Sequence, residues 1–534
     1  MDRGWRGRVP WINHKVNGTW KLVDREEAKG KKIFKPRPVF KRKWLPADLQ
    51  HPRGSIDKLK VRMTIAAYSR MLRDGVDYRE KYAATPRFDN TRCLFAIAAY
   101  FDLELSLDDV VAFFLNPFLE RGEKIFMEQD ERYKDGTGRI CQMLKACYGL
   151  PQASYHAQKQ LRDNYAKDGI KPTVSDRAVY IKMAEDKALP HAKLISSVHV
   201  DDALTAGTKE GISELRASMR RVFKLKSTDE PTLVVGVQVR RSRIHKWIKL
   251  HQEAYVLKLL QKEGMLDSNP ATTPLDVGAS KAVYGYGDDE PETAKDLKAR
   301  KRFQEIFGEL MWLAIKTRPD LSFAVNFFGR MLCFAREREL NLIRGQPLRY
   351  LNGTRDFGLV YCAGEDGLKM NAASDADFAG CPMTSRTTAG HFLKLGKYGY
   401  ITGGSKLLRP IQTSTGHAET TSASMLCRTE QYVRVLLREK GLEEQGRTVL
   451  DIDNAGVVKQ AINTSNHAQA KHYRVSQAYI QQQVQDKQVF LRQVPSNDNA
   501  SDFFTKALPR RPFEKHRLPI MGPQVEPEEC VNYM

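Results

Sequence analysis

The sequence predicts a multidomain protein of the α+β and α/β classes, and three observations lead to that prediction. Its 534 residues are too many for one ordinary domain, so three or four compact units are expected. Leu103, Leu105 and Leu107 place an apolar residue at every second position, which predicts a strand. Residues 368–510 instead mix strand-like and helical stretches in the manner of one compact α/β domain.

Local patterns predict the other elements of the first half. The segment ISSVHVDDALTAG (Ile195–Gly207) holds two adjacent carboxylates between two apolar arms, which predicts a β-hairpin with acids at its turn. Apolar residues in HQEAYVLKLLQKEGM (His251–Met265) recur with helical spacing. The stretch 277–296 is rich in Gly, Asp and Glu and is interpreted as a linker.

After the linker, the sequence predicts helices and then the mixed domain. Residues 302–332 are mostly helical in pattern, with a break at Arg318-Pro319. Residues 368–510 then follow the order strand, hairpin, long helix, strand, two helices, strand and helix. We expect this last segment to fold as one unit.

The charge balance predicts a polyanionic partner. Lys and Arg total 86 against 64 Asp and Glu, which gives a formal charge of +22 and a pI near 9.5. Basic side chains gain free energy on nucleic acid by displacing condensed counterions. The alternatives are a basic surface that serves only solubility, or an anionic membrane, although no basic amphipathic helix stands out.

Cysteine usage and hydropathy argue against several other classes. The eight cysteines include no Cys-x-x-Cys pair, so they predict neither a zinc frame nor a disulfide set, but reduced thiols. The first residues lack an apolar signal core, and no run approaches the length needed to cross a membrane. We expect an intracellular protein without a membrane partner.

Asp201 and Asp202 are the most informative residues of the first half. Two adjacent carboxylates at a hairpin turn repel one another, and divalent metal is the obvious compensation. Two Mg²⁺ ions could activate a primer 3′-oxygen and stabilise the leaving pyrophosphate. A third carboxylate is expected from LSLDDVVAFFLN (Leu105–Asn116), where Asp109 is the candidate and Asp108 its rival. The alternative for the pair is a solvated turn.

The last domain offers a second set of acids on different elements. Hydrolysis of a phosphodiester needs metal ions, and converging carboxylates could hold two of them. The candidates are Asp375, Glu419, Asp453 and Asp502. Their spacing does not by itself bring them together: Asp502 could instead support an Asn499 helix cap, Asp453 with Asn454 could cap the next helix, and Asp377 is interpreted as a polar neighbour.

Short motifs follow one another along the chain: NGTWKLV, GVDYREKYA, DVVAFFLNPFLE, KIFMEQ, LKACYGLPQAS, VHVDD, LHQEAYVLKLL, GELMWLAIKTRPDLSFAVN, LRYLNGTRDFGLVY, SDADFAG, TSTGHAE, DIDN and SDFFTKALP. In this order they resemble the copia-type LTR retrotransposon polyprotein, in its reverse transcriptase plus ribonuclease H region. The resemblance runs from about Trp11 to Leu518.

This resemblance implies a right-hand polymerase with fingers, palm and thumb, followed by a ribonuclease H-like mixed-sheet domain. Residues 1–245 would form fingers and palm, 246–365 thumb and tether, 366–510 the ribonuclease H-like domain and 511–534 a C-terminal tail. The implied activity is RNA-directed and DNA-directed DNA polymerisation with ribonuclease H cleavage. The alternative is a decayed, catalytically weak copy that only binds nucleic acid.

The resemblance also implies residue roles. Asp109, Asp201 and Asp202 would form the metal-binding triad of the polymerase, and the four acids of the last domain would form the nuclease site. Phe114 would gate the ribose 2′-hydroxyl, unless it is a core Phe. Four residues would contact the nucleotide: Phe114, Gln152 (otherwise a surface glutamine), Lys60 and Arg62, of which the two cations would grip the triphosphate.

Several positions depart from the pattern. His199 stands where the family usually has Tyr, and Pro117 replaces the Gly of an Asn-Gly turn, although proline cannot adopt a positive φ. His417 replaces the first acid of the Glu419 motif. His472 matches a family histidine and is interpreted as a helix-surface residue or phosphate contact, with Arg474 where an acid usually follows.

The implied cofactors are two Mg²⁺ ions per active site, with Mn²⁺ as a substitute, and the implied partners are RNA template, DNA primer, RNA–DNA hybrid and dNTPs. The location would be cytoplasmic and particle-associated, with the nucleus as a second site. Capsid, zinc-knuckle, protease and integrase motifs of the family polyprotein are not seen. We therefore expect a processed product or a truncated genomic copy.

Overall fold

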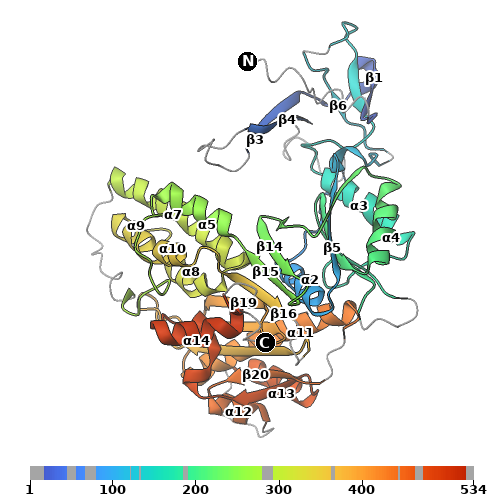
Figure 1. The fold of residues 1–534 in the computed structure, drawn as a ribbon. Coiled ribbons are helices and arrows are strands. Elements are labelled where there is room, and N and C mark those ends of the chain that lie inside the picture. The colour runs from blue at the N-terminus through green and yellow to red at the C-terminus, as the bar shows by residue number, and fades with distance from the viewer. Residues whose placement is uncertain are drawn as a thin grey trace.

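The structure is a computed structural model of the whole chain. It describes residues 17–44, 56–65, 78, 80–120, 122–131, 134–184, 191–279, 293–362, 367–442, 446–462 and 473–524. Figure 1 shows short N-terminal strands at the top, a sheet with two covering helices at the right, a layer of helices at the left and the C-terminal sheet at the bottom.

The predicted acidic hairpin lies at the centre of a six-stranded sheet, here called the hairpin sheet. Strands β10 (Leu194–His199) and β11 (Asp202–Gly207) form the hairpin, and β5 (Glu104–Val110) pairs antiparallel with β11. The sheet order is β12-β5-β11-β10-β9-β8. The outer strands are β12 (Leu225–Asp229), β9 (Val179–Lys182) and β8 (Lys171–Pro172).

Alternating side chains decide which helices cover each face of this sheet. Val198 and Ala203 pack with residues of α3 (Ala153–Ala166) and α4 (Lys209–Arg220) on one face. Leu105, Leu204 and Ala206 join the core that contains α2 (Phe88–Tyr100) on the other. The acids at the hairpin therefore lie at the end of a sheet that is fixed on both sides.

Two smaller sheets precede this region in sequence. One has the order β1-β7-β6-β2, and the other is the ribbon β3-β4. Their strands are β1 (Trp20–Val23), β2 (Ile33–Phe34), β3 (Pro36–Trp44), β4 (Ile56–Ile65), β6 (Phe126–Met127) and β7 (Ile140–Met143). Gly149, at a φ of +94°, lies against β4 so closely that a Cβ there would come 2.3 Å from the Ile65 carbonyl oxygen.

A fourth sheet, β13-β14-β15-β16, joins distant parts of the chain. Its strands are β13 (Leu233–Val234), β14 (Val237–Ser242), β15 (Trp247–His251) and β16 (Gly358–Cys362). The predicted helix at 251–265 is confirmed as α5 (Glu253–Glu263), and the break at Arg318-Pro319 is also confirmed. The helices after the predicted linker are α7 (Ala294–Lys316), α8 (Ser322–Gly329), α9 (Glu337–Ile343) and α10 (Arg349–Gly353).

Helix α7 begins inside the predicted linker. Thr293 and Asp296 form a capping box, in which each side chain accepts from the other residue's backbone N–H. Asp296 is therefore a capping residue rather than a linker acid.

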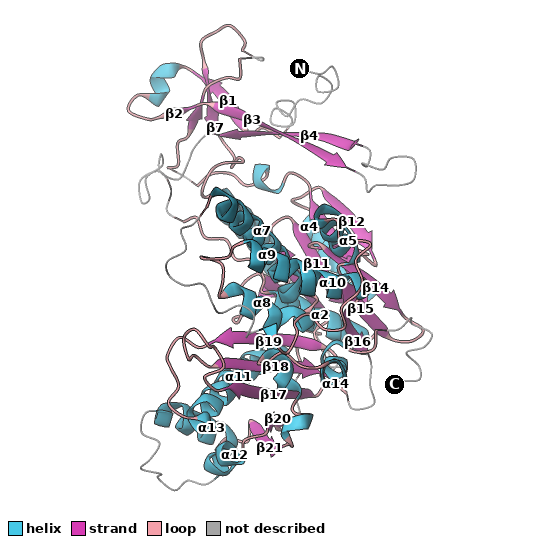
Figure 2. Ribbon diagram, turned by 90° about the vertical axis from the view of Figure 1, so that its left-hand side faces the viewer, coloured by secondary structure: helices cyan, strands magenta, loops and turns pink. Residues whose placement is uncertain are grey.

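The C-terminal sheet has the order β19-β18-β17-β20-β21 (Figure 2). The first three strands are antiparallel, and β20 and β21 run parallel to β17. The order of strands and helices predicted for residues 368–510 is confirmed. The elements are β17 (Met370–Asp377), β18 (Thr388–Leu395), β19 (Tyr400–Leu407), α11 (Thr415–Glu439), β20 (Thr448–Ile452), α12 (Ala455–Ile462), α13 (Arg474–Gln485), β21 (Val489–Gln493) and the short helix η8 (Ala500–Phe504).

The predicted C-terminal tail contains a packed helix, α14 (Arg510–Met521). Phe513 stacks on Phe503 at 4.9 Å between ring centroids, and Ile520 and Met521 are buried. These apolar contacts hold the helix against the rest of the fold. The prediction of a tail at 511–534 is therefore wrong for residues 511–521. The other domain boundaries stay predictions.

Mixed α/β organisation with several separate sheets confirms the predicted multidomain fold class. Within the described residues, no helix combines the length and apolar character needed to cross a membrane.

Two candidate active sites

Asp109 and Asp202 lie directly opposite each other on adjacent antiparallel strands. Such partners have Cα atoms about 5 Å apart and side chains on the same face of the sheet. Asp201 is in the two-residue turn of the hairpin, and its carbonyl oxygen accepts from the Val110 N–H at 2.9 Å. The three acids predicted for the polymerase site therefore meet at one end of the hairpin sheet.

The turn itself is strained at Val200. This residue has a φ of +62°, which a β-branched side chain rarely adopts. Strain of this kind is held in place by the surrounding structure and is frequent at functional sites. Here it fixes the direction in which Asp201 leaves the hairpin.

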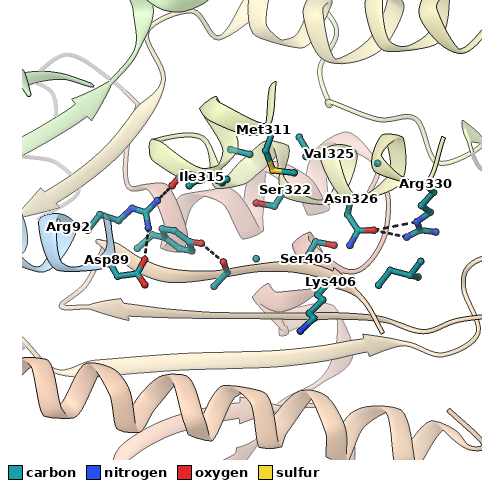
Figure 3. Close-up of a pocket in the computed structure, with 16 residues that line it drawn as sticks. Asp89, Arg92, Met311, Ile315, Ser322, Val325, Asn326, Arg330, Ser405 and Lys406 are labelled. Carbon is teal, nitrogen blue, oxygen red and sulfur yellow. Dashed lines mark hydrogen bonds and ion pairs between the residues drawn. The ribbon is translucent and has the colours of Figure 1, made fainter. Parts of the chain in front are cut away.

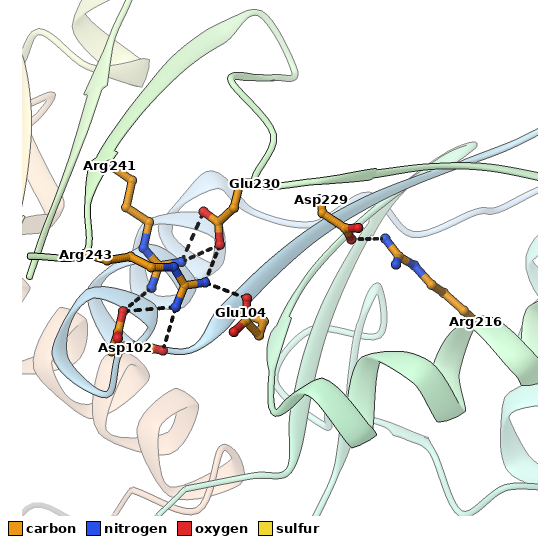
Figure 4. Close-up of polar contacts among 7 residues, drawn as sticks. All are labelled: Asp102, Glu104, Arg216, Asp229, Glu230, Arg241 and Arg243. Atoms are coloured by element: carbon orange, nitrogen blue, oxygen red, sulfur yellow. Dashed lines mark hydrogen bonds and ion pairs between the residues drawn. The ribbon is translucent and has the colours of Figure 1, made fainter.

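Asp108 faces away from these acids. It is fully buried, accepts from the Ser106 hydroxyl at 2.7 Å and pairs with Arg216 of α4 at 3.0 Å. Arg216 also contacts Asp229 at 2.6 Å (Figure 4). Because its carboxylate is already neutralised, the structure favours Asp109 over Asp108 as the site acid.

A second group of ion pairs fixes the start of β5. Arg241 of β14 and Arg243, which follows that strand, contact Asp102 and Glu230, and Arg243 also contacts Glu104 (Figure 4). These contacts join the fourth sheet to the hairpin sheet. They hold the strand that carries Asp109 at the end remote from the acids.

The acids of the C-terminal domain converge more closely. Ligand oxygens of Asp375, Glu419 and Asp453 all lie within 4.8 Å of one another, and among the described residues this is the one set of acidic, His or Cys side chains that meets that spacing. Glu419 Oε2 and Asp453 Oδ1 are buried without hydrogen-bond partners. Buried carboxylate oxygens without hydrogen-bond partners are suitable ligands for a divalent cation, so these residues fit a metal site.

Burial raises the pKa of Glu419 to about 9, because it removes the hydration of the carboxylate, and the neighbouring Asp375 and Asp453 add to this rise. Asp502 adjoins the same group, and burial together with Asp375 raises its pKa to about 7. Lys506 Nζ lies 2.8 Å from Asp502 and 3.9 Å from Asp375. The fourth acid is therefore balanced by a lysine of the same chain segment.

The structure decides whether Asp453 and Asp502 take part in helix caps or in the acid group. Asn454 caps α12, since its Oδ1 accepts from the N–H groups of Gly456 and Val457. Asn499 caps η8 by accepting from the Ser501 N–H. Their acidic neighbours Asp453 and Asp502 point into the acid group instead.

Comparison with known proteins then identifies the family. The profile described as "Reverse transcriptase (RNA-dependent DNA polymerase)" matches residues 17–277, which contain the three hairpin-site acids. The retrovirus-related Pol polyprotein from transposon TNT 1-94 of Nicotiana tabacum is 28% identical over 503 residues, covering 93% of this chain and 36% of that protein. The Pol polyprotein from transposon RE1 of Arabidopsis thaliana is 27% identical over 535 residues, covering 98% and 34%.

Residues 17–277 form a reverse transcriptase domain, and the chain as a whole is similar to copia-type Pol polyproteins of plant transposons. It spans about a third of the length of these Pol relatives. The solved foamy viral protease–reverse transcriptase in complex with RNA/DNA hybrid aligns with a TM-score of 0.47 and 9% identity, over 93% of this chain and 54% of that chain.

Two of the residues expected to contact a nucleotide, Phe114 and Arg62, lie against the ring of Tyr148. Phe114 is half-buried, with its ring 5.5 Å from that of Tyr148 in an edge-on contact. The Arg62 guanidinium lies over the Tyr148 ring, 5.4 Å from its centroid. Lys60 lies opposite Lys41 in the β3-β4 ribbon, but its side chain is outside the described residues.

Gln152 is fully buried, and neither of its amide atoms has a hydrogen-bond partner. This finding corrects the alternative of a surface glutamine. A buried amide without partners is costly, which makes Gln152 a candidate for contact with a ligand.

The departures from the reverse transcriptase pattern are accommodated. His199 lies opposite Asp202, and burial lowers its pKa. Pro117 is buried and accepts from the Ala146 N–H at 2.9 Å, while the positive φ of this segment is at Ala112. His417 stacks on Tyr473, and His472 lies outside the described residues.

Sequence reasoning missed Tyr148, Lys506 and Lys316, of which Lys316 lines a small cavity together with His199 and Asp202. Lys506 stands four residues after Asp502, and that charge spacing could have indicated the pair. Tyr148 and Lys316 carry no comparable signal, because distant segments bring them to the site.

Proposed function

We propose that the chain is an RNA-directed and DNA-directed DNA polymerase that also cleaves the RNA of RNA–DNA hybrids, for retrotransposon replication. The pairing of Asp109 with Asp202, beside the Asp201 turn, is the observation that carries this proposal. The match of residues 17–277 to the reverse transcriptase family supports the nucleotidyl transfer.

In the polymerase site, the three carboxylates bind the cations and orient the reacting groups. Two Mg²⁺ ions, or Mn²⁺, would supply Lewis-acid activation of the primer 3′-oxygen and charge neutralisation at the pyrophosphate. Phe114, braced by Tyr148, limits the space beside the sugar and so discriminates against a 2′-hydroxyl. Arg62 contributes positive charge for the triphosphate of the incoming dNTP, with Lys60 as its proposed neighbour.

In the nuclease site, Asp375, Glu419 and Asp453 hold the cations, and Asp502 completes the group. Burial and, to a smaller extent, the neighbouring Asp375 and Asp453 raise the pKa of Glu419, so a bound cation would offset the cost of its charged form. Lys506 moderates the charge on Asp502, to which it is ion-paired. The proposed substrates are the RNA template, the DNA primer and their hybrid, consistent with the formal charge of +22. The cytoplasmic, particle-associated and nuclear locations stay predictions.

The test is extension of a labelled DNA primer on an RNA template and on a DNA template with Mg²⁺, comparing wild type with Asp201→Asn/Asp202→Asn. Extension that is lost in the double variant supports the proposal, with the circular dichroism spectrum as the folding control. No extension by folded wild-type protein that still binds hybrid would support the decayed copy instead. Cleavage of a labelled RNA strand by wild type and Asp375→Asn tests the nuclease separately.

A further inference from the structure

The C-terminal end of α11 lies against the hairpin sheet, although the strands of that sheet are distant from it in sequence. The Glu439 carboxylate accepts from the Val174 N–H at 2.6 Å and the Ser175 N–H at 3.3 Å, and also from the Ser175 hydroxyl. These two residues belong to the turn between β8 and β9, in which the Thr173 hydroxyl donates to the Asp176 carbonyl oxygen at 2.7 Å. One carboxylate therefore holds the end of α11 on a turn that is itself fixed.

Lys440, which follows α11, makes further contacts in the same place. Its side chain is fully buried, and its Nζ donates at 2.9 Å to Asn90 Oδ1 in the first turn of α2. Asn90 Nδ2 in turn donates to Asp176 Oδ2 at 2.8 Å. The Lys440 carbonyl oxygen accepts from the Ala192 N–H at 2.8 Å, just before the start of β10. The end of α11, the start of α2, the β8–β9 turn and the start of β10 thus meet at one point, here called the junction.

Two of the elements that meet at the junction carry the acid sites at their other ends. β10 runs from the junction to the turn that holds Asp201. α11 runs from the junction to Glu419, which is about 30 Å from Glu439 along an unbroken helix with a rise of 1.5 Å per residue. The Ser422 hydroxyl of α11 donates to the Asp375 carbonyl oxygen at 2.9 Å, so the helix and the acid group move together. The place of this acid group relative to the hairpin acids is therefore set where α11 ends.

A separate contact joins α2 to the edge strand of the C-terminal sheet. Arg92 is buried and pairs with Asp89 at 3.2 Å, and its Nη1 donates to the Ile401 carbonyl oxygen of β19 at 2.9 Å. Its Nη2 donates to the Ile315 carbonyl oxygen near the end of α7 (Figure 3). Because these contacts do not depend on Glu439, loss of the junction leaves the C-terminal domain attached, with Arg92 as the point about which it tilts.

We propose that Glu439 and Lys440 are positioning residues of the nuclease. They fix the angle of the C-terminal domain on the hairpin sheet, and so they determine which phosphodiester of the RNA strand is cut, counted from the primer terminus. The proposal rests on the proposed function and assigns a role to residues that touch neither acid site. With the junction intact, one rigid arrangement presents one bond to the acids. Without it, the domain adopts a range of tilts and several neighbouring bonds are cut.

The test maps the cuts that the full-length protein makes in a 5′-labelled RNA template annealed to a recessed DNA primer, with Mg²⁺, without dNTPs and at no more than one cut per strand. The variants are Glu439→Ala and Lys440→Met, of which the second keeps the apolar stem and removes the amine. Asp486→Ala is the matched control. Asp486 is an exposed acid at the C-terminal end of α13 in the same domain, and its side chain has no hydrogen bond or ion pair within the described residues.

Three further measurements accompany the map of cuts for every variant. They are primer extension with dNTPs, total cleavage of a long hybrid without a primer terminus, and Tm. A junction that only stabilised the fold would lower Tm and leave the cut positions as they are in wild type, so the positions separate the two roles.

We expect Glu439→Ala to raise the share of cuts outside the main position about 10-fold, because loss of hydrogen bonds to a charged group shifts a two-state equilibrium by about that factor. Lys440→Met should spread the cuts in the same way, and Asp486→Ala should match wild type. Extension and total cleavage should stay within about 2-fold of wild type, since both acid groups are distant from the junction.

Unchanged cut positions in both junction variants, with cleavage and extension intact, would overturn the positioning role whether or not Tm falls. Absence of cleavage by folded wild-type protein would instead overturn the nuclease part of the proposed function, and the positioning role with it.

Discussion

Arg216 reaches from α4 to the back of the hairpin sheet, where its Nε donates to Asp108 Oδ1 at 3.0 Å. One residue further along β5, Asp109 lies opposite Asp202 on the other face. Because successive side chains of a strand point to opposite faces, two adjacent acids serve different purposes. Asp108 holds the helix to the sheet, and Asp109 belongs to the candidate active site.

The two acids should respond differently to the same substitution. Asp108→Asn leaves Arg216 without its buried partner and is expected to lower the free energy of unfolding by about 1–3 kcal/mol while retaining extension. Asp109→Asn should lower primer extension by about 100-fold or more with little change in stability. Urea denaturation and extension assays on both variants check this. Loss of extension in Asp108→Asn at full stability would reverse the assignment.

Divalent metal should stabilise the C-terminal acid group. Mn²⁺ or Mg²⁺ relieves the repulsion among Asp375, Glu419 and Asp453, so a concentration near 100 Kd is expected to add about 2.7 kcal/mol. Differential scanning calorimetry with and without metal measures the rise in Tm. Asp375→Asn should lose the larger part of that rise, whereas Asp377→Asn, outside the acid group, should keep it. An equal rise in wild type and Asp375→Asn would place metal binding elsewhere.

The buried pair Arg318–Asp320 should be a main determinant of stability in the helical layer. Arg318 is 1% exposed, contacts both oxygens of Asp320 and also donates to Thr354. Arg318→Met leaves the Asp320 charge compensated only by the Tyr350 hydroxyl, and is expected to cost about 3–5 kcal/mol.

Chemical denaturation compares the single variants Arg318→Met and Asp320→Asn with the double variant Arg318→Met/Asp320→Asn. The double variant should recover part of the loss, because no uncompensated buried charge remains. A double variant as unstable as the sum of the two single variants would contradict an ion-pair origin.

Acid should destabilise the fold through two buried histidines. Burial lowers the pKa of His251 and of His516 to about 4, from an ordinary value near 6.5. The folded state thus favours the neutral imidazole, while the unfolded state takes up a proton below pH 6.5. The stability that each histidine contributes is complete above pH 6.5 and falls by about 1.4 kcal/mol per pH unit between 6.5 and 4.

Tm measured between pH 7.5 and pH 4.5 checks this expectation. His251→Gln cannot titrate, so its Tm should fall less steeply over that range than the Tm of wild type. Parallel pH profiles of the two proteins would show that His251 is not protonated on unfolding.

The sequence by itself determined the local elements and the identity of the acids. Alternation at Leu103, Leu105 and Leu107, the apolar arms around Asp201 and the helical spacing after His251 are short-range patterns, and β5, the hairpin and α5 follow from them. The motifs also identified the acids that the structure places in two groups. Such patterns are readable because strand and helix periodicity depends on neighbouring residues alone.

Only the tertiary structure decided what surrounds each acid. Strand pairing set Asp109 against Asp202, and α4 neutralised Asp108 through Arg216, which is 108 residues away in sequence. Tyr148 and Lys316 reached the hairpin site for the same reason, and the chain end that resembled a tail became α14 by packing Phe513 on Phe503. Burial, charge compensation and pKa depend on segments that approach one another only after folding, so no local pattern in the sequence specifies them.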